Sequence, residues 1–135
     1  MPYWLLKTEP EDFSYDDLVR NGRERWNGVK NFRALKNLRQ MRPGDQVFIY
    51  HTGKEKAIIG VGQVVSEPYP DPDETDPRFI VVDVAPDYRL ERPVTLKEIK
   101  ADSAFDAWEL VTQSRLSVMP VMPEHWRRIH GMAAK

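Results

Sequence analysis

The feature that most constrains the fold is a pair of short strand-forming segments joined by a tight connection. Residues 46–51 and 57–65 are rich in Val, Ile and Phe, and Thr52-Gly53-Lys54-Glu55 joins them as in a β-hairpin. In the second segment, Gly60 and Gly62 alternate with larger residues, which indicates tight curvature or the close approach of another backbone. Because a small barrel needs such bends, the segment predicts a strongly curved sheet.

Further strands and helices are marked by composition and by capping residues. Strands are expected at residues 3–7, at 79–90 with an interruption at Pro86, and at 116–119. Residues 68–77 are rich in Pro and Asp and predict a loop. Capping patterns and apolar periodicity place helices at 14–20, at 32–41, after Thr95, near 107–111 and between Pro123 and Gly131.

This order of elements predicts a single domain over residues 1–135 with an α+β fold. Its 135 residues suit one hydrophobic core. The strands follow one another as hairpins, and no parallel β-α-β crossover is evident. We therefore expect a small mixed, mostly antiparallel β-barrel surrounded by short helices.

Composition narrows the setting in which the chain works. It contains no Cys, which excludes disulfides, thiol nucleophiles and thiolate metal sites. No apolar run approaches the roughly 20 residues that cross a bilayer, and the start of the chain does not resemble a signal peptide. We expect a cytoplasmic monomer with no membrane contact.

Charge is unevenly distributed along a chain whose net charge is only −1. Residues 20–42 contain eight cationic side chains and one carboxylate, Glu24, so this stretch carries a net charge of +7. The acids gather elsewhere, at Asp71, Asp73, Glu74 and Asp76. Such a chain could present a basic face to phosphate, although a solvated helix face explains the same pattern.

Motifs for catalysis are not evident. The chain lacks a Walker-type loop, a dinucleotide glycine fingerprint, HExxH and G-x-S-x-G, and its three His have no strong metal spacing. His51 follows a strand and could act as a general base with Glu9 or Glu55 as its orienting carboxylate. More often a His at a strand end only makes a structural hydrogen bond. We therefore expect no catalytic residues, no metal and no cofactor.

The segment Trp26-Asn27-Gly28-Val29-Lys30-Asn31 is unusual, because a Trp beside Gly and between charged residues is out of place for core packing. A Trp face can stack on a base or on a cation. Alternatively, Trp26 folds back as a lid on the core. The residues around it do not decide between the two interpretations.

Several ordered motifs give a resemblance that covers nearly the whole chain. They are YWLLKTEPEDFSYDDL at the start, WNGVKN at 26–31, GDQVFIYHT at 44–52, IIGVGQVVSEPYPD at 58–71, RPVTLKEIK at 92–100 and RLSVMPVMPEHW at 115–126. With these motifs the chain resembles the EVE domain family. Departures from the usual pattern are small: Lys30 replaces Arg, Phe32 replaces Tyr and Thr52 replaces Ser.

The resemblance implies a PUA-like fold, related to readers of methylated adenine in RNA, and a reader function for modified bases in DNA such as modified cytosine. It places the base pocket at the end of the first strand, in the 26–31 loop and at the end of the 46–51 strand. The implied pocket residues are Lys7, Thr8, Glu9, Pro10, Trp26, Val29, Asn31, Tyr50, His51, Thr52 and Ser117.

Physical reasoning gives these residues roles. Trp26 would stack on the base, with Tyr50 as a weaker candidate wall. Asn31 could contact the Watson–Crick edge, yet it is also the expected helix cap. The cations Lys30, Arg33, Lys36 and Arg39 would hold phosphates. Two alternatives remain open: an enzyme that uses His51 on a nucleotide or another small ligand, and a binder of a small metabolite.

Overall fold

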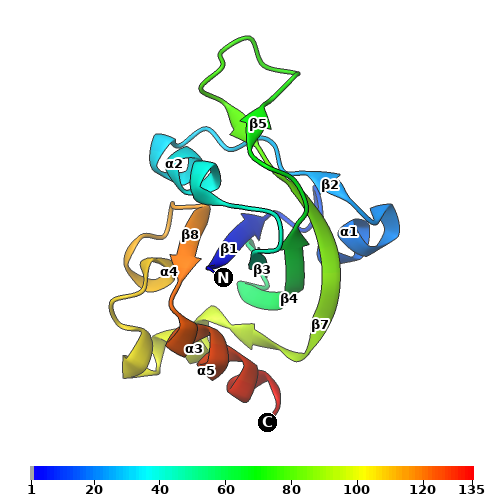
Figure 1. The fold of residues 1–135 in the computed structure, drawn as a ribbon. Coiled ribbons are helices and arrows are strands. Elements are labelled where there is room, and N and C mark those ends of the chain that lie inside the picture. Colours follow the sequence, from blue (N-terminus) through cyan, green and yellow to red (C-terminus); the bar gives the residue numbers. More distant parts are fainter. Residues whose placement is uncertain (1) are drawn as a thin grey trace.

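The computed structural model describes residues 2–135 and shows one strongly curled sheet surrounded by short helices (Figure 1). Six strands pair in the order β2-β7-β4-β3-β1-β8, and β5 and β6 form a separate two-stranded hairpin. The strands are β1 Tyr3–Thr8, β2 Glu24–Arg25, β3 Gln46–His51, β4 Ala57–Val64, β5 Tyr69–Pro70, β6 Ile80–Val81, β7 Asp83–Thr95 and β8 Val118–Val121. The helices are α1 Tyr15–Asn21, α2 Phe32–Gln40, α3 Leu96–Lys100, the 3-10 turn η1 Ser103–Phe105, α4 Glu109–Thr112 and α5 Pro123–Ala133. The expected α+β, barrel-like fold is confirmed.

The placement of β1 differs from the expectation. This strand pairs in parallel with β3, from Tyr3 opposite Gln46 to Thr8 opposite His51, and antiparallel with β8 on its other side. The expectation that no parallel crossover exists was therefore wrong. The crossover is a long segment that holds both α1 and α2, so it does not have the compact strand-helix-strand form that reveals such units in a sequence.

Capping residues begin three helices as predicted. The Ser14 side chain accepts a hydrogen bond from the Asp17 amide, and the Asp17 carboxylate accepts one from the Ser14 amide, which completes a capping box. Thr95 and Glu98 form the same reciprocal pair at the start of α3. The Asn31 side chain accepts from the Ala34 amide at the start of α2. Local hydrogen bonding therefore fixes where these helices begin.

Several boundaries differ from the predicted ones. The predicted strand 79–90 divides into β6 and the long β7, and Pro86 lies within β7 opposite Gly62, where the pairing register shifts. The last strand is 118–121 rather than 116–119. Helix α5 continues through Gly131 to Ala133, because a glycine late in a helix does not have to end it.

The two alternating glycines of β4 mark close approach as well as curvature. A Cβ atom on Gly60 would lie 2.7 Å from the Tyr15 ring and 3.0 Å from the Tyr88 carbonyl oxygen. One on Gly62 would lie 2.9 Å from the Ala85 carbonyl oxygen. The pairing register of β4 with β7 shifts between Ile58 and Gly60 and again between Val61 and Gly62. The glycines thus let α1 and β7 pack directly on the β4 backbone.

Replacing Gly60 with Ala is expected to lower the free energy of unfolding by about 1–3 kcal/mol through overpacking. The Tyr15 ring has little room to move, because it is buried and its hydroxyl donates to the Val61 carbonyl at 2.8 Å. Gly131→Ala is the matched control, since a Cβ there meets nothing within 4 Å and should stabilise α5 by about 0.5–1 kcal/mol. Chemical denaturation of both variants measures the two effects, and equal stability would contradict the packing account.

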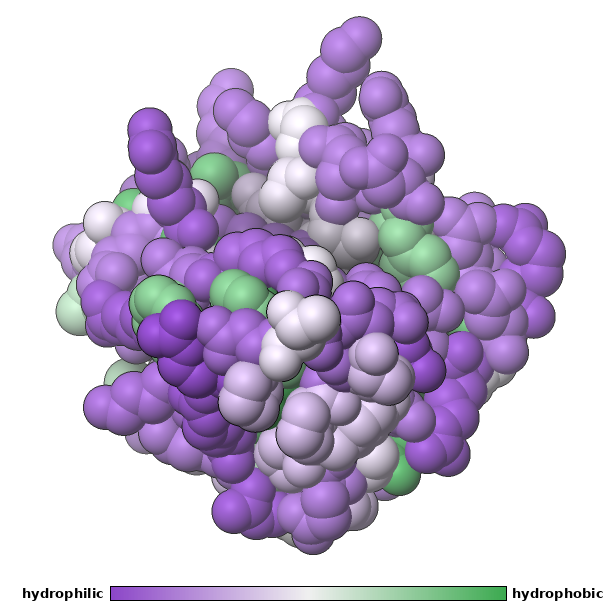
Figure 2. Space-filling view, turned by 90° about the horizontal axis from the view of Figure 1, so that it is seen from above, coloured by the Kyte–Doolittle hydropathy of each residue, from purple (hydrophilic) through white to green (hydrophobic). Residues whose placement is uncertain are grey.

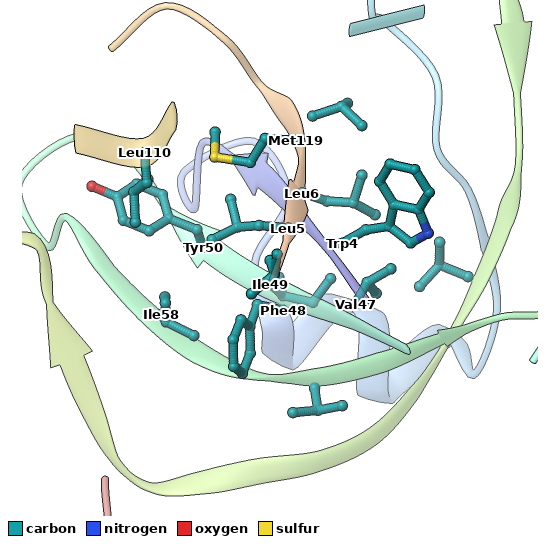
Figure 3. Packing of buried hydrophobic residues seen from close by; sticks show 14 of the residues in the cluster. Trp4, Leu5, Leu6, Val47, Phe48, Ile49, Tyr50, Ile58, Leu110 and Met119 are labelled. Carbon is teal, nitrogen blue, oxygen red and sulfur yellow. The ribbon is translucent and has the colours of Figure 1, made fainter. Parts of the chain in front are cut away.

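The core lies between the curled sheet and the helices, and Figure 3 shows the β1 and β3 side chains that fill it. Trp4, Leu5, Leu6, Phe48 and Ile49 are all buried. At one end, the Trp126 ring of α5 is stacked between Tyr3 and Phe48, with centroid distances of 4.3 and 4.0 Å. This packing fixes β1 and β3, whose far ends carry the candidate site. None of the helices within residues 2–135 is long and apolar enough to cross a membrane.

Candidate nucleic-acid interface

A hollow of about 380 Å³ lies where β1 ends, and we call it the β1–β2 pocket. The end of β1 and the turn after it form one side, and β2 with the following loop forms the other. Its lining residues are Lys7, Thr8, Glu9, Asp12, Phe13, Glu24, Arg25, Trp26, Asn27 and Gly28.

A tight turn after β1 shapes the first side of this pocket. The Asp12 and Phe13 amides both donate to the Glu9 carbonyl, and the Thr8 hydroxyl donates to the Phe13 carbonyl at 2.6 Å. Gly28, with φ of +79°, supplies the left-handed residue on the other side. These contacts hold the polar ends of Glu9 and Thr8 close to the loop that carries Trp26.

Trp26 combines the two roles that the sequence left open. Only 6% of its surface is exposed, and its amide donates to the Val82 carbonyl at 2.8 Å. The Phe13 ring meets the indole edge-on, with a centroid distance of 5.9 Å. Trp26 is therefore packed into the core, and the small part that stays open forms a wall of the pocket.

Tyr50 and Thr52 lie in a second hollow of about 220 Å³, which also borders Lys7. The Lys7 Nζ atom lies 5.7 Å from the centroid of the Tyr50 ring. Burial raises the pKa of Tyr50 to about 12, so its hydroxyl remains protonated at neutral pH. The Thr52 hydroxyl donates to the Glu9 carboxylate at 3.1 Å and so connects this hollow to the β1–β2 pocket.

Asn31 lies at a third hollow of about 340 Å³, together with Arg33 and the segment 112–116. Its side-chain oxygen accepts from the Ala34 amide at 3.0 Å, so the capping role is occupied. Ser117 contributes its carbonyl, which accepts from the Lys7 amide at 2.9 Å. Val29 is buried and Pro10 is half-buried, and neither lines any of the three hollows. The predicted pocket residues thus divide among three hollows, of which Lys7 lines two.

His51 is buried, and both of its ring nitrogens are occupied. Nε2 accepts from the Tyr15 amide at 3.0 Å, which leaves the proton on Nδ1, where it faces the Glu55 carboxylate at 2.7 Å. A general base needs a nitrogen that can reach substrate. This geometry favours the structural interpretation, in which His51 ties the start of α1 to the end of β3.

The folded chain brings the acidic residues 71–76 against the basic segment 20–42, although the two are well separated in the sequence. Arg25 pairs with Asp73, and Lys30 pairs with Glu74 and also lies over the Phe79 ring. Further ion pairs join Arg20 to Asp17, Arg23 to Asp83 and Arg42 to Glu67. The β5–β6 hairpin therefore folds back over residues 25–30 and neutralises part of the basic segment.

Three cations of α2 remain without carboxylate partners in residues 2–135. Arg33 donates to the Gln113 side chain, Arg39 donates to the Arg78 carbonyl, and Lys36 is exposed. Figure 2 views the molecule from the side of the β5–β6 hairpin and shows a mostly hydrophilic face. The face beside α2 and the hairpin is thus polar, with cations only partly neutralised.

Sequence reasoning missed several residues of the site. Asp12, Phe13 and Arg25 line the β1–β2 pocket, and Lys56 and Lys100 line the second hollow. Phe13 carried a signal, since it precedes the Ser14 cap, but that position indicates only a hydrophobic staple. Lys56 and Lys100 are far apart in the sequence and come together only through the pairing of β4 with β7.

Known proteins match nearly the whole chain. The family model described as "EVE domain" matches residues 2–132. Mouse thymocyte nuclear protein 1 is 31% identical over 158 residues, which cover 92% of this chain and 70% of that protein.

Solved structures give the same result. Rpa0253 from Rhodopseudomonas palustris is 39% identical with a TM-score of 0.94, covering 99% of this chain and 94% of that one. Human THYN1 in complex with DNA containing 5-methylcytosine is 30% identical with a TM-score of 0.92, covering 100% and 99%. By family model, sequence identity and fold, the chain belongs to the EVE domain family.

Proposed function

We propose that this protein is a binding module that reads nucleic acid by holding one flipped, modified base, most simply a modified cytosine in DNA, in the β1–β2 pocket. The observation that carries the proposal is the pocket itself, which combines an aromatic wall from Trp26 with the polar groups of Thr8, Glu9 and Asn27. The related human THYN1 structure holds DNA containing 5-methylcytosine, which supports a nucleic-acid ligand for this fold.

The chemistry of the pocket suits a base that has left the stack. Flipping costs a few kcal/mol, and contacts in the pocket must return that energy. A carboxylate such as Glu9 can accept from the exocyclic amine of cytosine. Trp26 and Phe13 give apolar surface for the ring and for a methyl group. The cations Arg33, Lys36 and Arg39 would contact phosphates beside the pocket and add affinity without sequence preference.

The test is a binding titration against oligonucleotides of one length that carry plain or modified bases, in single- and double-stranded forms. We expect one modified base to bind more tightly than its plain counterpart. Glu9→Gln should change this preference, whereas Glu11→Gln, an exposed glutamate two residues away that does not line the pocket, should leave it unchanged. Equal affinity for every base in the panel would contradict the proposal.

Neutralising the acidic loop is expected to raise affinity for nucleic acid. Asp73 and Glu74 pair with Arg25 and Lys30, so phosphates must displace these carboxylates before they can use the same cations. Because exposed ion pairs are each worth about 0–1 kcal/mol, Asp73→Asn with Glu74→Gln should gain up to about 2 kcal/mol at low salt. The gain should fall as salt rises.

A matched double variant controls for net charge. Glu91→Gln with Asp106→Asn also removes two exposed carboxylates, neither of which pairs with a cation within residues 2–135. Titrations at two salt concentrations compare the variants. An equal gain in both would show that only net charge matters, and no gain in either would place the nucleic acid away from Arg25 and Lys30.

A further inference from the structure

The second hollow beside Lys7 has features that the base pocket does not require. Lys7, Lys56 and Lys100 come from β1, from the turn before β4 and from the end of α3, and all three line it. We call this hollow of about 220 Å³ the lysine pocket. Its remaining lining residues are Tyr50, Thr52, Gly53, Leu96, Leu110, Val111 and Ser114.

The three ammonium groups of the lysine pocket have no carboxylate partner. Throughout residues 2–135, none of them lies within 4.0 Å of an Asp or Glu oxygen, whereas five cations of the 20–42 segment are paired. The nearby Glu55 carboxylate faces His51 instead. Like charges that share one hollow repel, and a bound anion removes that repulsion.

The backbone at Lys56 adds a second, independent observation. Its φ of +43° makes it the one non-glycine residue with a positive φ among the described residues. The Leu96 amide donates to the Lys56 carbonyl at 2.7 Å, and pairing of Ala57 with Thr95 follows directly. A non-glycine residue in this region is strained, and such strain gathers at functional sites. Here the turn places a lysine at the pocket where a glycine would relieve the strain.

The floor of the lysine pocket offers hydrogen-bond donors as well as charge. The Lys7 ammonium donates to the Ser114 carbonyl at 2.9 Å, and burial lowers its pKa. A bound anion would stabilise the charged Lys7 ammonium, which burial has removed from part of its water. The Tyr50 hydroxyl is the other donor, since burial keeps it protonated at neutral pH. Positive charge together with a neutral hydroxyl suits the oxygens of a phosphate group.

We propose that the lysine pocket binds a backbone phosphate of the nucleic acid whose base occupies the β1–β2 pocket. This inference rests on the proposed function, because Lys7 borders both hollows and so places a phosphate next to the bound base. Lys56 and Lys100 would hold the phosphate by charge, and Tyr50 would donate to one of its oxygens.

The test is the salt dependence of oligonucleotide binding by Lys56→Gln with Lys100→Gln. Each lost phosphate contact lowers the slope of log affinity against log salt by roughly one unit, so the double variant, which loses its hold on one phosphate, should lose about one unit. The matched control is Lys54→Gln with Lys97→Gln, which removes lysines from the same turn and the same helix that do not line the pocket. Equal slopes for the two double variants would overturn the proposal.

Two further measurements separate this proposal from the base-reading function. The ratio of affinities for modified and plain DNA should be unchanged in Lys56→Gln with Lys100→Gln. If the double variant loses slope but the unmodified protein shows no base preference, the phosphate site stands and the base-reading function fails. If the unmodified protein prefers the modified base but the double variant keeps its slope, the base-reading function stands and the phosphate site fails. Lys56→Gly removes the same charge and accommodates the positive φ. It should therefore also reduce the salt slope, even if Lys56→Gln disturbs the turn.

Inorganic phosphate gives a direct probe of the pocket. We expect it to shift the amide resonances of residues 52–56 and of Lys100 in the unmodified protein, and not in the double variant. A nucleoside 5′-monophosphate that competes far better than an internal backbone phosphate would overturn the backbone assignment and indicate a terminal or free phosphate instead.

Discussion

Replacing Trp26 with alanine is expected to lower the free energy of unfolding by about 3–5 kcal/mol, the usual cost of removing a buried Trp. Its exposed fraction of 6% and its contact with Phe13 make the packing effect larger than any effect on binding. A ligand that stacks on an aromatic side chain gains only about 1–3 kcal/mol. Calorimetric melting should therefore show a large fall in Tm before any ligand is added.

Trp26→Phe separates the role in binding from the role in folding. It keeps an aromatic ring at the pocket wall and should cost less stability, so that binding can be measured on a folded protein at low temperature. We expect weaker binding of the modified base with little change in salt slope. A nearly unchanged Tm for Trp26→Ala would contradict the burial account and would mean that the indole lies free in the pocket.

Selectivity for the modified base is expected to be about 10–200-fold, the range that one small apolar group allows. A buried methyl group contributes about 0.8 kcal/mol from its area alone, and a well-shaped pocket gains about 1–3 kcal/mol. Phosphate contacts and stacking do not sense the methyl group. Raising the salt should therefore weaken modified and plain DNA together and leave their ratio almost constant.

The measurement is a pair of titrations at several salt concentrations with oligonucleotides that differ only in the modification. Discrimination above about 10⁴-fold would indicate that a polar mark is read by buried hydrogen bonds. The structure then directs attention to Glu9 and Thr52, which share a hydrogen bond beside the pocket. His51 and Asn31 are less suited to that role, because His51 Nε2 and Asn31 Oδ1 already accept hydrogen bonds from backbone amides.

Local features of the fold could be predicted because their causes are local. Ser14, Asn31 and Thr95 each bind an amide three residues later, so each cap is visible in a short stretch of sequence. The parallel pairing of β1 with β3 could not be predicted in the same way. It depends on how the whole 9–45 segment packs, and no short motif records that.

The sequence did not show how the residues predicted for the site are arranged relative to one another. A resemblance supplies consecutive residues such as Tyr50, His51 and Thr52, but successive side chains on a strand point to opposite faces. His51 accordingly contacts the α1 backbone, whereas Tyr50 and Thr52 line the lysine pocket. The pairing of Asp73 with Arg25 was also hidden, since 48 residues separate them.

The position of β1 between β3 and β8 has a consequence for protein synthesis. Tyr3 to Leu6 are synthesised well before their antiparallel partners, residues 118–121. During translation, one edge of β1 stays unpaired until residue 121 has left the ribosome, and an unpaired apolar edge invites association with other chains. Pairing over so long a separation also slows folding. The six-stranded sheet can therefore be completed only after residue 121 has emerged, which leaves this edge of β1 exposed while residues 7–120 are synthesised.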